Sequence, residues 1–315
     1  MNCPHYPKYL LAVGLMSLSS VAFAAPFAYV ANEGSGTISI IDVATDNVVG
    51  DMPAGKKPRG LAISGEWIYV SDQPNNSLQL IDLKSRKPGP SIDLGKSPEG
   101  VYASPDGRWI AAAIEENDEV AIIDTRDNKV VSSIKVQGEN PEHAVFSPDG
   151  KTMLVSAEDG GALDIIDFDT RKQVAQLKIG DRPRGIGFLP DGSRAYVAAE
   201  NSNAIYVIDM ASKKVLTHLK GGTRSNGVTV HPDGSRVYIS NGGDASVSVI
   251  DTTSNKIIAT VPVGQRPWNM AITPDGKKLY VANGRSNSVS VVDTEKNIKL
   301  HDISVGERPW GVVIH

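Results

Sequence analysis

Basic and aromatic side chains recur at two positions of this sequence, directly before and after a proline that returns about every 42 residues. Guanidinium groups form charge-assisted hydrogen bonds with carboxylates and phosphates, and indole rings supply apolar walls to ligand pockets. If the repeats meet around one opening, these side chains form a site for an anionic or aromatic ligand. The predicted ligand-binding residues are Arg59, Arg182, Arg184, Arg224, Arg266, Trp268, Arg308 and Trp310.

The same arginines allow a purely structural interpretation. Acidic or amide residues recur where each repeat leaves its second predicted strand, at Asn32, Asp72, Glu115, Glu158, Glu200, Asn241 and Asn283. Because both positions are expected on one face, each arginine can pair with an acid of an adjacent loop and hold the repeats together without a ligand. The sequence leaves both interpretations open.

Catalytic and metal chemistry have weaker support. Glu142 and His143 are the best acid–base candidates, because they break the repeat pattern beside Pro141. Neighbouring residues of a strand point to opposite faces, so the alternative is a histidine that only fills the opening. The other histidines fall in separate repeats without ligand spacing, and no loop has a calcium-site pattern. We therefore predict no metal and no cofactor, and leave enzymatic activity undecided.

The elements that must position these residues follow from the repeat. Each unit contains a short apolar strand, usually a Pro-Asp-Gly turn, a strand such as Tyr-Val-Ala-Asn and a strand such as Val-Ser-Val-Ile-Asp. Alternation with period two and β-branched residues predict strands, and Pro-Asp-Gly predicts a tight turn. Seven aspartates end the third strand at intervals of 40 to 43 residues, at Asp42, Asp82, Asp124, Asp167, Asp209, Asp251 and Asp293.

A period of this length built from short strands is typical of propeller blades. The sequence therefore predicts an all-β, seven-bladed β-propeller with four antiparallel strands per blade. The interval of 43 residues places one extra residue near 134–138, which we interpret as a bulge. Residues 27–32 match a second strand and residues 310–315 match a first strand. We expect the two ends to pair and close the ring, because an open ring would leave strand edges unpaired.

Residues 1–24 read as an export signal. Lys8 precedes an apolar run that is too short to span a membrane, and Ala22-Phe-Ala24 fits a cleavage site. Residues 25–315 would then form the propeller, without Cys3 and therefore without a disulfide. The whole chain carries a net charge of −4, and loss of Lys8 would make the mature chain slightly more acidic. We expect an exported, periplasmic protein without a membrane span in its mature form.

The repeat resembles that of the YVTN-repeat β-propeller family. The resemblance rests on Tyr-Val-Ala-Asn at 29–32 and 280–283, Tyr-Val-Ala-Ala at 196–199, Ser-Pro-Asp-Gly and Val-Ile-Asp, and covers the whole mature chain. It implies a seven-bladed propeller. Members are often exported, some accompany periplasmic oxidation systems that depend on the quinone PQQ, and one bacterial branch is described as binding single-stranded DNA. The shared motifs are strands and turns, so they carry the fold and leave the function open.

Three aromatic residues depart from the repeat at the start of the second strand. Phe27, Trp67 and Trp109 occupy a position where the other four repeats have polar residues. Their blades are consecutive around the closed ring, so we predict an aromatic sector that binds a protein partner or a second copy of the chain. The alternative is that the rings fold over the blade edges and cover the core.

These observations predict an exported binding or scaffold module for a periplasmic protein or a small anionic ligand. The alternative is a periplasmic enzyme of lactonase type, which needs an acid, a base and a substrate clamp that converge in one concave site. Single-stranded nucleic acid is the less favoured ligand, because phosphate contacts dominate such binding and the net charge of the chain is negative.

Overall fold

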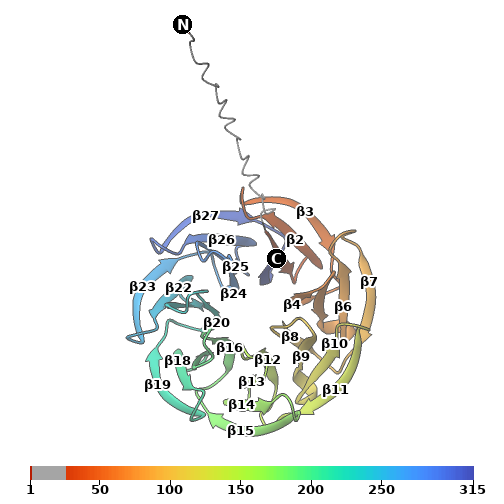
Figure 1. Ribbon diagram of the computed structural model, residues 1–315, viewed down its shortest axis with the longest axis vertical. Coiled ribbons are helices and arrows are strands. Elements are labelled where there is room, and N and C mark those ends of the chain that lie inside the picture. The colour runs from red at the N-terminus through yellow and green to blue at the C-terminus, as the bar shows by residue number, and fades with distance from the viewer. Residues whose placement is uncertain (2–25) are drawn as a thin grey trace.

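Seven four-stranded antiparallel sheets surround a central axis in the computed structural model, which describes Met1 and residues 26–315 (Figure 1). We number the blades from the one that contains both chain ends. From the inner to the outer strand, blade 1 comprises β28 (Pro309–Ile314), β1 (Phe27–Asn32), β2 (Thr37–Asp42) and β3 (Asn47–Pro53). The predicted seven-bladed propeller is thereby confirmed. The predicted export signal at 1–24 lies outside the described residues.

The other six blades use consecutive strands, again from the inner to the outer edge. Blades 2 to 4 comprise β4 (Pro58–Ser64), β5 (Trp67–Asp72), β6 (Ser77–Asp82), β7 (Pro88–Asp93); β8 (Pro98–Ala103), β9 (Trp109–Ile114), β10 (Glu119–Asp124), β11 (Lys129–Lys135); β12 (Pro141–Phe146), β13 (Thr152–Ala157), β14 (Ala162–Asp167), β15 (Lys172–Lys178). Blades 5 to 7 comprise β16 (Pro183–Phe188), β17 (Arg194–Ala199), β18 (Ala204–Asp209), β19 (Lys214–Lys220); β20 (Ser225–Val230), β21 (Arg236–Asn241), β22 (Ser246–Asp251), β23 (Lys256–Pro262); β24 (Pro267–Ile272), β25 (Lys278–Asn283), β26 (Ser288–Asp293), β27 (Ile298–Ser304).

The ring closes through the two ends of the chain, as expected. β28 pairs antiparallel with β1, with Ala28 opposite Ile314 and Ala31 opposite Gly311. Two further backbone hydrogen bonds join Phe27 and His315, at 2.8 and 2.9 Å. Blade 1 is therefore built from both ends of the sequence, which leaves no unpaired inner strand.

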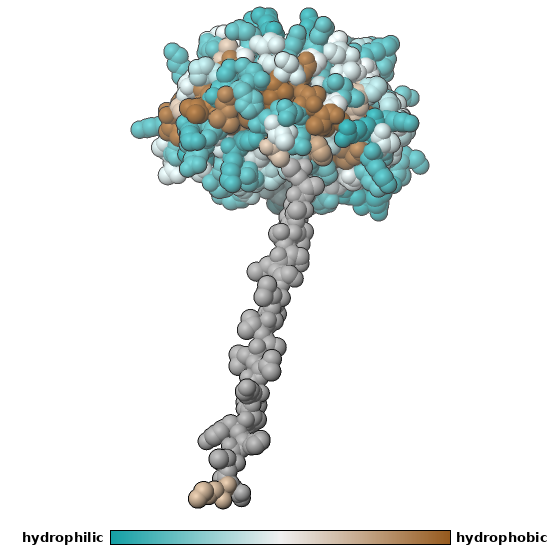
Figure 2. Space-filling view, turned by 90° about the horizontal axis from the view of Figure 1, so that it is seen from above, coloured by the Kyte–Doolittle hydropathy of each residue, from teal (hydrophilic) through white to brown (hydrophobic). Residues whose placement is uncertain are grey.

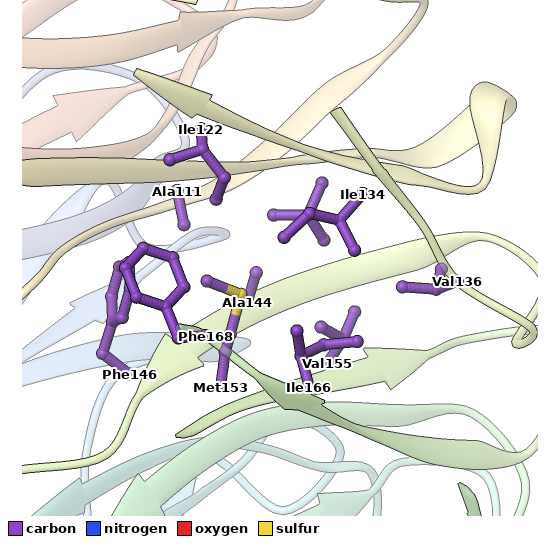
Figure 3. Close-up of a cluster of buried hydrophobic side chains, with 11 residues drawn as sticks. Ala111, Ile122, Ile134, Val136, Ala144, Phe146, Met153, Val155, Ile166 and Phe168 are labelled. Carbon is purple, nitrogen blue, oxygen red and sulfur yellow. The ribbon is translucent and has the colours of Figure 1, made fainter. Parts of the chain in front are cut away.

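The core consists of apolar clusters between adjacent blades. One of them lies between blades 3 and 4 and combines aliphatic side chains with the neighbouring rings of Phe146 and Phe168 (Figure 3). These side chains come from the buried faces of strands whose residues alternate in and out. Each fully buried Ile, Leu or Val side chain contributes about 1.5–3 kcal/mol, so the interfaces between blades carry most of the stability.

The tyrosine of the Tyr-Val-Ala-Asn strand joins neighbouring blades. The hydroxyl of Tyr69 donates to Asn128 Oδ1 of the next blade at 2.5 Å, and the hydroxyl of Tyr196 donates to Asn255 Oδ1 at 2.6 Å. Tyr280 makes the equivalent bond to Asp46 across the ring closure. The motif therefore supports the fold, because its tyrosine is a contact between blades. We call this contact the tyrosine latch.

The outer strands carry exposed aliphatic residues in a band around the rim of the disc, which Figure 2 shows between polar side chains. Six of them sit at the residue that a bulge leaves unpaired, namely Val49, Val131, Val174, Leu216, Ile258 and Leu300. Such bulges protect an edge from pairing with other chains. The extra residue near 134–138 has a different place from the one predicted. It lengthens the connection 136–140 between β11 and β12, and the bulge in blade 3 is the one that all these blades share.

Within residues 26–315 the helical segments are two turns of 3-10 helix, η1 (Gln73–Asn75) and η2 (Glu115–Asn117). Neither has the length and apolar content that a membrane-crossing helix needs.

Candidate ligand-binding mouth

The loops that lead into the inner strands meet the loops that follow the second strands at one end of the channel. Most residues before the corner prolines, including Arg182, Arg266 and Arg308, adopt the left-handed backbone conformation with φ between 51° and 59°. Several residues assigned to the second set of loops are in fact the last residues of strands, among them Asn32 and Asn283. The residue that follows each second strand is Glu33, Gln73, Glu115, Glu158, Glu200, Gly242 or Gly284. Three of them, Glu33, Glu158 and Glu200, pair with arginines.

An ionic network occupies the blade 4 to blade 5 side of this mouth. Arg184 pairs with Glu142 at 2.5 Å, with Glu158 at 2.7 Å and with Glu200 at 3.0 Å, and its side chain is only 13% exposed. Arg182 pairs with Glu158 at 2.5 Å. These contacts agree with the structural interpretation of the arginines, because each buried charge already has a partner.

Blade 7 also contributes to this network, since Arg266 donates to Glu200 at 2.7 Å. Arg224 is more exposed and stands 3.9 Å from the same carboxylate. The network thus takes in four of the predicted ligand-binding residues without a ligand.

A second ionic cluster lies at blades 1 to 3. The Nη1 atom of Arg59 donates to both oxygens of Glu99, at 2.6 and 2.7 Å, and its Nη2 atom reaches Glu33 at 3.2 Å. Lys57 pairs with the same Glu33 carboxylate at 3.2 Å. Glu33 was not identified from the sequence, because the loop was taken to begin one residue earlier.

Three carboxylates converge beside Arg59, since Glu99, Glu115 and Glu142 have oxygen atoms within 4.8 Å of one another. Burial and the neighbouring Glu142 charge raise the pKa of Glu99 to about 8. Burial also acts to raise the pKa of Glu142, but Arg184 holds it below its ordinary value. Crowded buried carboxylates cannot all be charged, so this group retains a proton near neutral pH.

Those oxygens could offer ligands to a hard cation. In this structure, however, side chains already satisfy two of the carboxylates by hydrogen bonds. Arg59 and Gln73 donate to Glu99, and Ser97 Oγ donates to Glu115 at 2.7 Å. Asp72 and Glu200 do not join these three carboxylates: Asp72 accepts from the backbone of Lys56 and Lys57, whereas Glu200 belongs to the ionic network.

His143 and Glu142 point to different surroundings. The Tyr102 hydroxyl and His143 Nδ1 share a hydrogen bond of 2.6 Å, and burial raises the pKa of Tyr102. The His143 ring also stacks on Trp310, with centroids 6.0 Å apart and an angle of 14°. Burial lowers the pKa of His143 to about 4, so the imidazole is neutral. Tyr102, His143 and Trp310 thus form an aromatic plug in the channel, while Glu142 faces Arg184.

The predicted Trp310 therefore lies deeper than expected. It is 7% exposed and borders a channel cavity of about 330 Å³ that is mainly lined by aliphatic residues of the inner strands. The sequence could not reveal that Trp310 is buried, because Trp268 occupies the same repeat position in blade 7 and the two residues look equivalent.

An open pocket of about 410 Å³ remains on the blade 7 to blade 1 side of the mouth. It brings together four of the predicted residues, Arg59, Arg266, Trp268 and Arg308. Its other lining residues are Glu33, Lys57, Gly284 and Arg285. Of the five cations, Arg285 and Arg308 are exposed and have no ion pair within residues 26–315. We call this site the mouth pocket.

Trp268 forms one wall of the mouth pocket. Its ring packs on the backbone of Gly284, where a β-carbon would stand 2.7 Å from the ring. Arg285 was missed in the sequence, because only the first residue of each loop after a second strand was compared.

The predicted aromatic sector lies on the opposite face, where the hairpin turns are. Phe27, Trp67 and Trp109 are each half-buried and pack against the clusters between blades. Trp67 covers Gly89 of its own blade, where a β-carbon would stand 2.5 Å from the ring. Trp109 differs from the other two, because two guanidinium groups approach its ring, those of Arg108 at 4.4 Å and Arg171 at 5.0 Å.

Comparison with known proteins supports the fold. Residues 167–306, less than half of the chain, match the family model "Lactonase, 7-bladed beta-propeller". A hydrazine synthase chain of Kuenenia stuttgartiensis is 22% identical, with a TM-score of 0.79 over 90% of this chain and 99% of that chain. A protein of unknown function from Desulfotomaculum acetoxidans is 19% identical, with a TM-score of 0.79 over 91% and 98% of the two chains.

A third similar structure is the dihydro-heme d1 dehydrogenase NirN in complex with DHE. It is 16% identical, with a TM-score of 0.69 over 94% of this chain and 76% of that chain. The search among curated proteins found no match. Identities below 25% show the fold alone. The seven closed blades and these likenesses together identify the chain as a seven-bladed β-propeller, consistent with the family expected from its repeats.

Proposed function

We propose that this propeller is a binding module whose mouth pocket holds an anionic ligand with a planar aromatic part. The observation that carries the proposal is the pair Arg285 and Arg308, two exposed cations without an ion pair among the described residues, beside the wall of Trp268. A carboxylate or phosphate can accept hydrogen bonds from both guanidinium groups, and a planar ring can stack on the indole.

The other arginines of the mouth differ from Arg285 and Arg308 in having acidic partners within the protein. Arg182, Arg184 and Arg224 face the acids of blades 4 and 5, so their charge is used within the protein. The cations of the mouth pocket outnumber its single carboxylate, that of Glu33. We therefore expect the pocket to attract anions and to bind them more weakly as salt rises.

Calorimetric titration with 1-naphthoate and its neutral amide tests the proposal. The acid should bind at 20 mM salt and lose affinity at 200 mM, whereas the amide should bind at least about tenfold more weakly. Arg308→Gln and Trp268→Ala should each weaken binding of the acid. Equal binding of acid and amide would contradict an anion site.

Arg224→Gln is the matched control. Arg224 occupies the repeat position of Arg308 and shares its left-handed backbone, with φ of 57° against 51°. It does not line the mouth pocket, so its removal should leave naphthoate binding unchanged. A loss equal to that of Arg308→Gln would point to the general charge of the protein and away from a built pocket.

A second candidate is lactone hydrolysis, favoured by the partial match to the lactonase family model. Glu142 is the acid–base candidate in this case; it pairs with Arg184 and does not line the mouth pocket, so the substrate would have to bind beside Arg184. Incubation with glucono-δ-lactone, followed by acid release in a pH-stat, tests this activity. Activity that Glu142→Gln abolishes would support the enzyme over the binding module.

We further propose that the protein acts outside the cytoplasm, in the periplasm, because residues 1–24 have the sequence features of an export signal. A periplasmic oxidation system that depends on PQQ is one setting in keeping with the resemblance of the repeats. Fractionation of cells that express the full chain tests the location, and the full-length protein in the cytoplasm would refute it.

A further inference from the structure

The junction of blades 3 and 4 lacks the tyrosine latch. At three other junctions a tyrosine latch reaches the residue before the outer strand of the next blade, as Tyr69 reaches Asn128. Blade 3 has Ala111 in the place of that tyrosine, and blade 4 has Arg171 in the place of the asparagine. The latch is therefore absent here, and a long cation stands where its acceptor would be.

Aromatic rings surround the guanidinium group of Arg171. Its central carbon lies 3.3 Å from the centroid of Phe168 and 5.0 Å from that of Trp109. Phe168 packs in turn on Phe146 in the cluster between the blades, with centroids 4.7 Å apart (Figure 3). These contacts fix the cation at the edge of the core, half out of water.

Arg171 has no counter-ion in the part of the chain that the structure describes. Its Nη1 atom is buried and has no hydrogen-bond partner. Burial lowers the pKa of Arg171, although the charge of Asp169 acts in the opposite direction. The nearby Arg108 differs, because Asp124 accepts two hydrogen bonds from it, at 2.9 and 2.7 Å. A half-buried cation without a partner is costly, so an arriving anion would be stabilised there.

A cavity of about 620 Å³ opens beside Arg171. Two hairpin turns, 104–106 and 148–151, form its sides, and Trp109 and Phe168 form its apolar wall. Three exposed aspartates line it as well, at Asp106, Asp149 and Asp169.

Hydrogen bonds within the turns lower the pKa values of two of these carboxylates and keep them charged. Asp106 accepts from Ser104, and Asp149 accepts from Ser147. The cavity therefore has a half-buried positive charge and a rim on which these three carboxylates outnumber the single exposed cation, Lys151.

We propose that this cavity docks a protein partner that inserts one carboxylate side chain, flanked by basic residues, against Arg171. The carboxylate would supply the missing counter-ion, and its aliphatic stem would pack on Trp109 and Phe168. The basic flanks would meet the aspartates of the rim, which would repel a segment with several acids. The site lies on the face opposite the mouth pocket and does not depend on it. Of the three aromatic residues predicted to bind a partner, this proposal assigns a role only to Trp109, whose ring would contact the inserted side chain.

Fluorescence polarisation with three labelled, end-blocked peptides tests the docking site on the intact propeller. The probes are Lys-Leu-Glu-Leu-Lys, its Gln analogue Lys-Leu-Gln-Leu-Lys and the acidic Glu-Leu-Glu-Leu-Glu. The first should bind at least about tenfold more tightly than the other two, and Arg171→Gln should remove this preference. Trp109→Thr, which introduces the residue type that blade 4 has at Thr152, should also weaken binding.

Blade 2 offers matched controls. Arg86 occupies the turn position of Arg171, with φ of 59° against 57°, and Trp67 occupies the strand position of Trp109. Arg86→Gln and Trp67→Thr should leave peptide binding unchanged, and melting curves should show that all four variants are folded. Absence of binding, equal binding of the Glu and Gln peptides, or an equal loss in Arg86→Gln would overturn the proposal. A dimer in sedimentation that Arg171→Gln dissolves would overturn it in favour of self-association.

Discussion

Replacing Arg184 with methionine tests how far the ionic network of the mouth supports the fold. The side chain is 13% exposed and pairs with Glu142, Glu158 and Glu200. Removal of one partner from a buried ion pair costs about 3–5 kcal/mol, because the remaining charges stay desolvated. A cost of 1 kcal/mol shifts the Tm of a large domain by about 2–4 °C, so we expect a fall of about 6–20 °C near pH 8.

The pH dependence of this loss has a definite sign. Burial acts to raise the pKa values of Glu142 and Glu200, but Arg184 holds both below their ordinary range. Without Arg184 these folded-state pKa values should rise above the unfolded-state values. The stability that protonation then provides is present at low pH and is lost as pH rises through the new folded-state values. The variant should therefore lose less stability at pH 5 than at pH 8.

Scanning calorimetry of both proteins at pH 5 and pH 8 measures this difference. Arg126→Met is the control, because Arg126 pairs with Asp124 but has a side chain that is 69% exposed. Exposed pairs contribute about 0–1 kcal/mol, so this variant should melt within a few degrees of the wild type at both pH values. A loss in Arg184→Met as small as that of the control, or equal losses at both pH values, would refute the reasoning.

Three further predictions address other parts of the molecule. The pKa of Glu99 is raised to about 8, so the stability that its protonated form provides is lost as pH rises toward 8. In Glu99→Gln, the free energy of unfolding measured in urea should therefore change less between pH 5 and pH 9 than in the wild type. Tyr69→Phe should cost about 1–2 kcal/mol in urea unfolding, since Asn128 loses its donor; equal stability would argue against the latch. Deletion of 311–315 should abolish cooperative unfolding, because β1 loses its inner partner; an unchanged Tm would contradict ring closure by β28.

The fold could be predicted from the sequence because every blade repeats the same local signals. Pro-Asp-Gly turns, alternating β-branched strands and the split repeat at residues 27–32 and 310–315 each constrain the chain locally. The pairing of β28 with β1 then follows from the count of strands. The place of the extra residue near Gln137 could not be predicted in this way, since a loop and a bulge give the same spacing.

The mouth was harder to predict, because side chains at equivalent positions have different surroundings. Trp268 and Trp310 share one repeat position, yet the first lines an open pocket and the second stacks on His143 inside the channel. His143 belongs to a blade on another side of the channel, and no local pattern relates it to Trp310. Contacts across the axis therefore lie beyond what a comparison of repeats can show.

One set of contacts within the mouth nevertheless follows from repeat positions in the sequence. Arg184 contacts the residue after the second strand of its own blade, Glu200, and that of the preceding blade, Glu158. In blade 7 the corresponding residues are Trp268, Gly284 and Gly242.

The basic residue and both acids are thus replaced together, and the two glycines leave the space that large side chains use. A β-carbon at Gly284 would stand 2.7 Å from the Trp268 ring, and one at Gly242 would stand 2.9 Å from Nη1 of Arg266. Loss of the acids removes the partners that would neutralise the cations of this side, and loss of their side chains opens the pocket. The mouth pocket therefore results from one coordinated change in the repeat, which explains why it lies on the blade 7 side of the mouth.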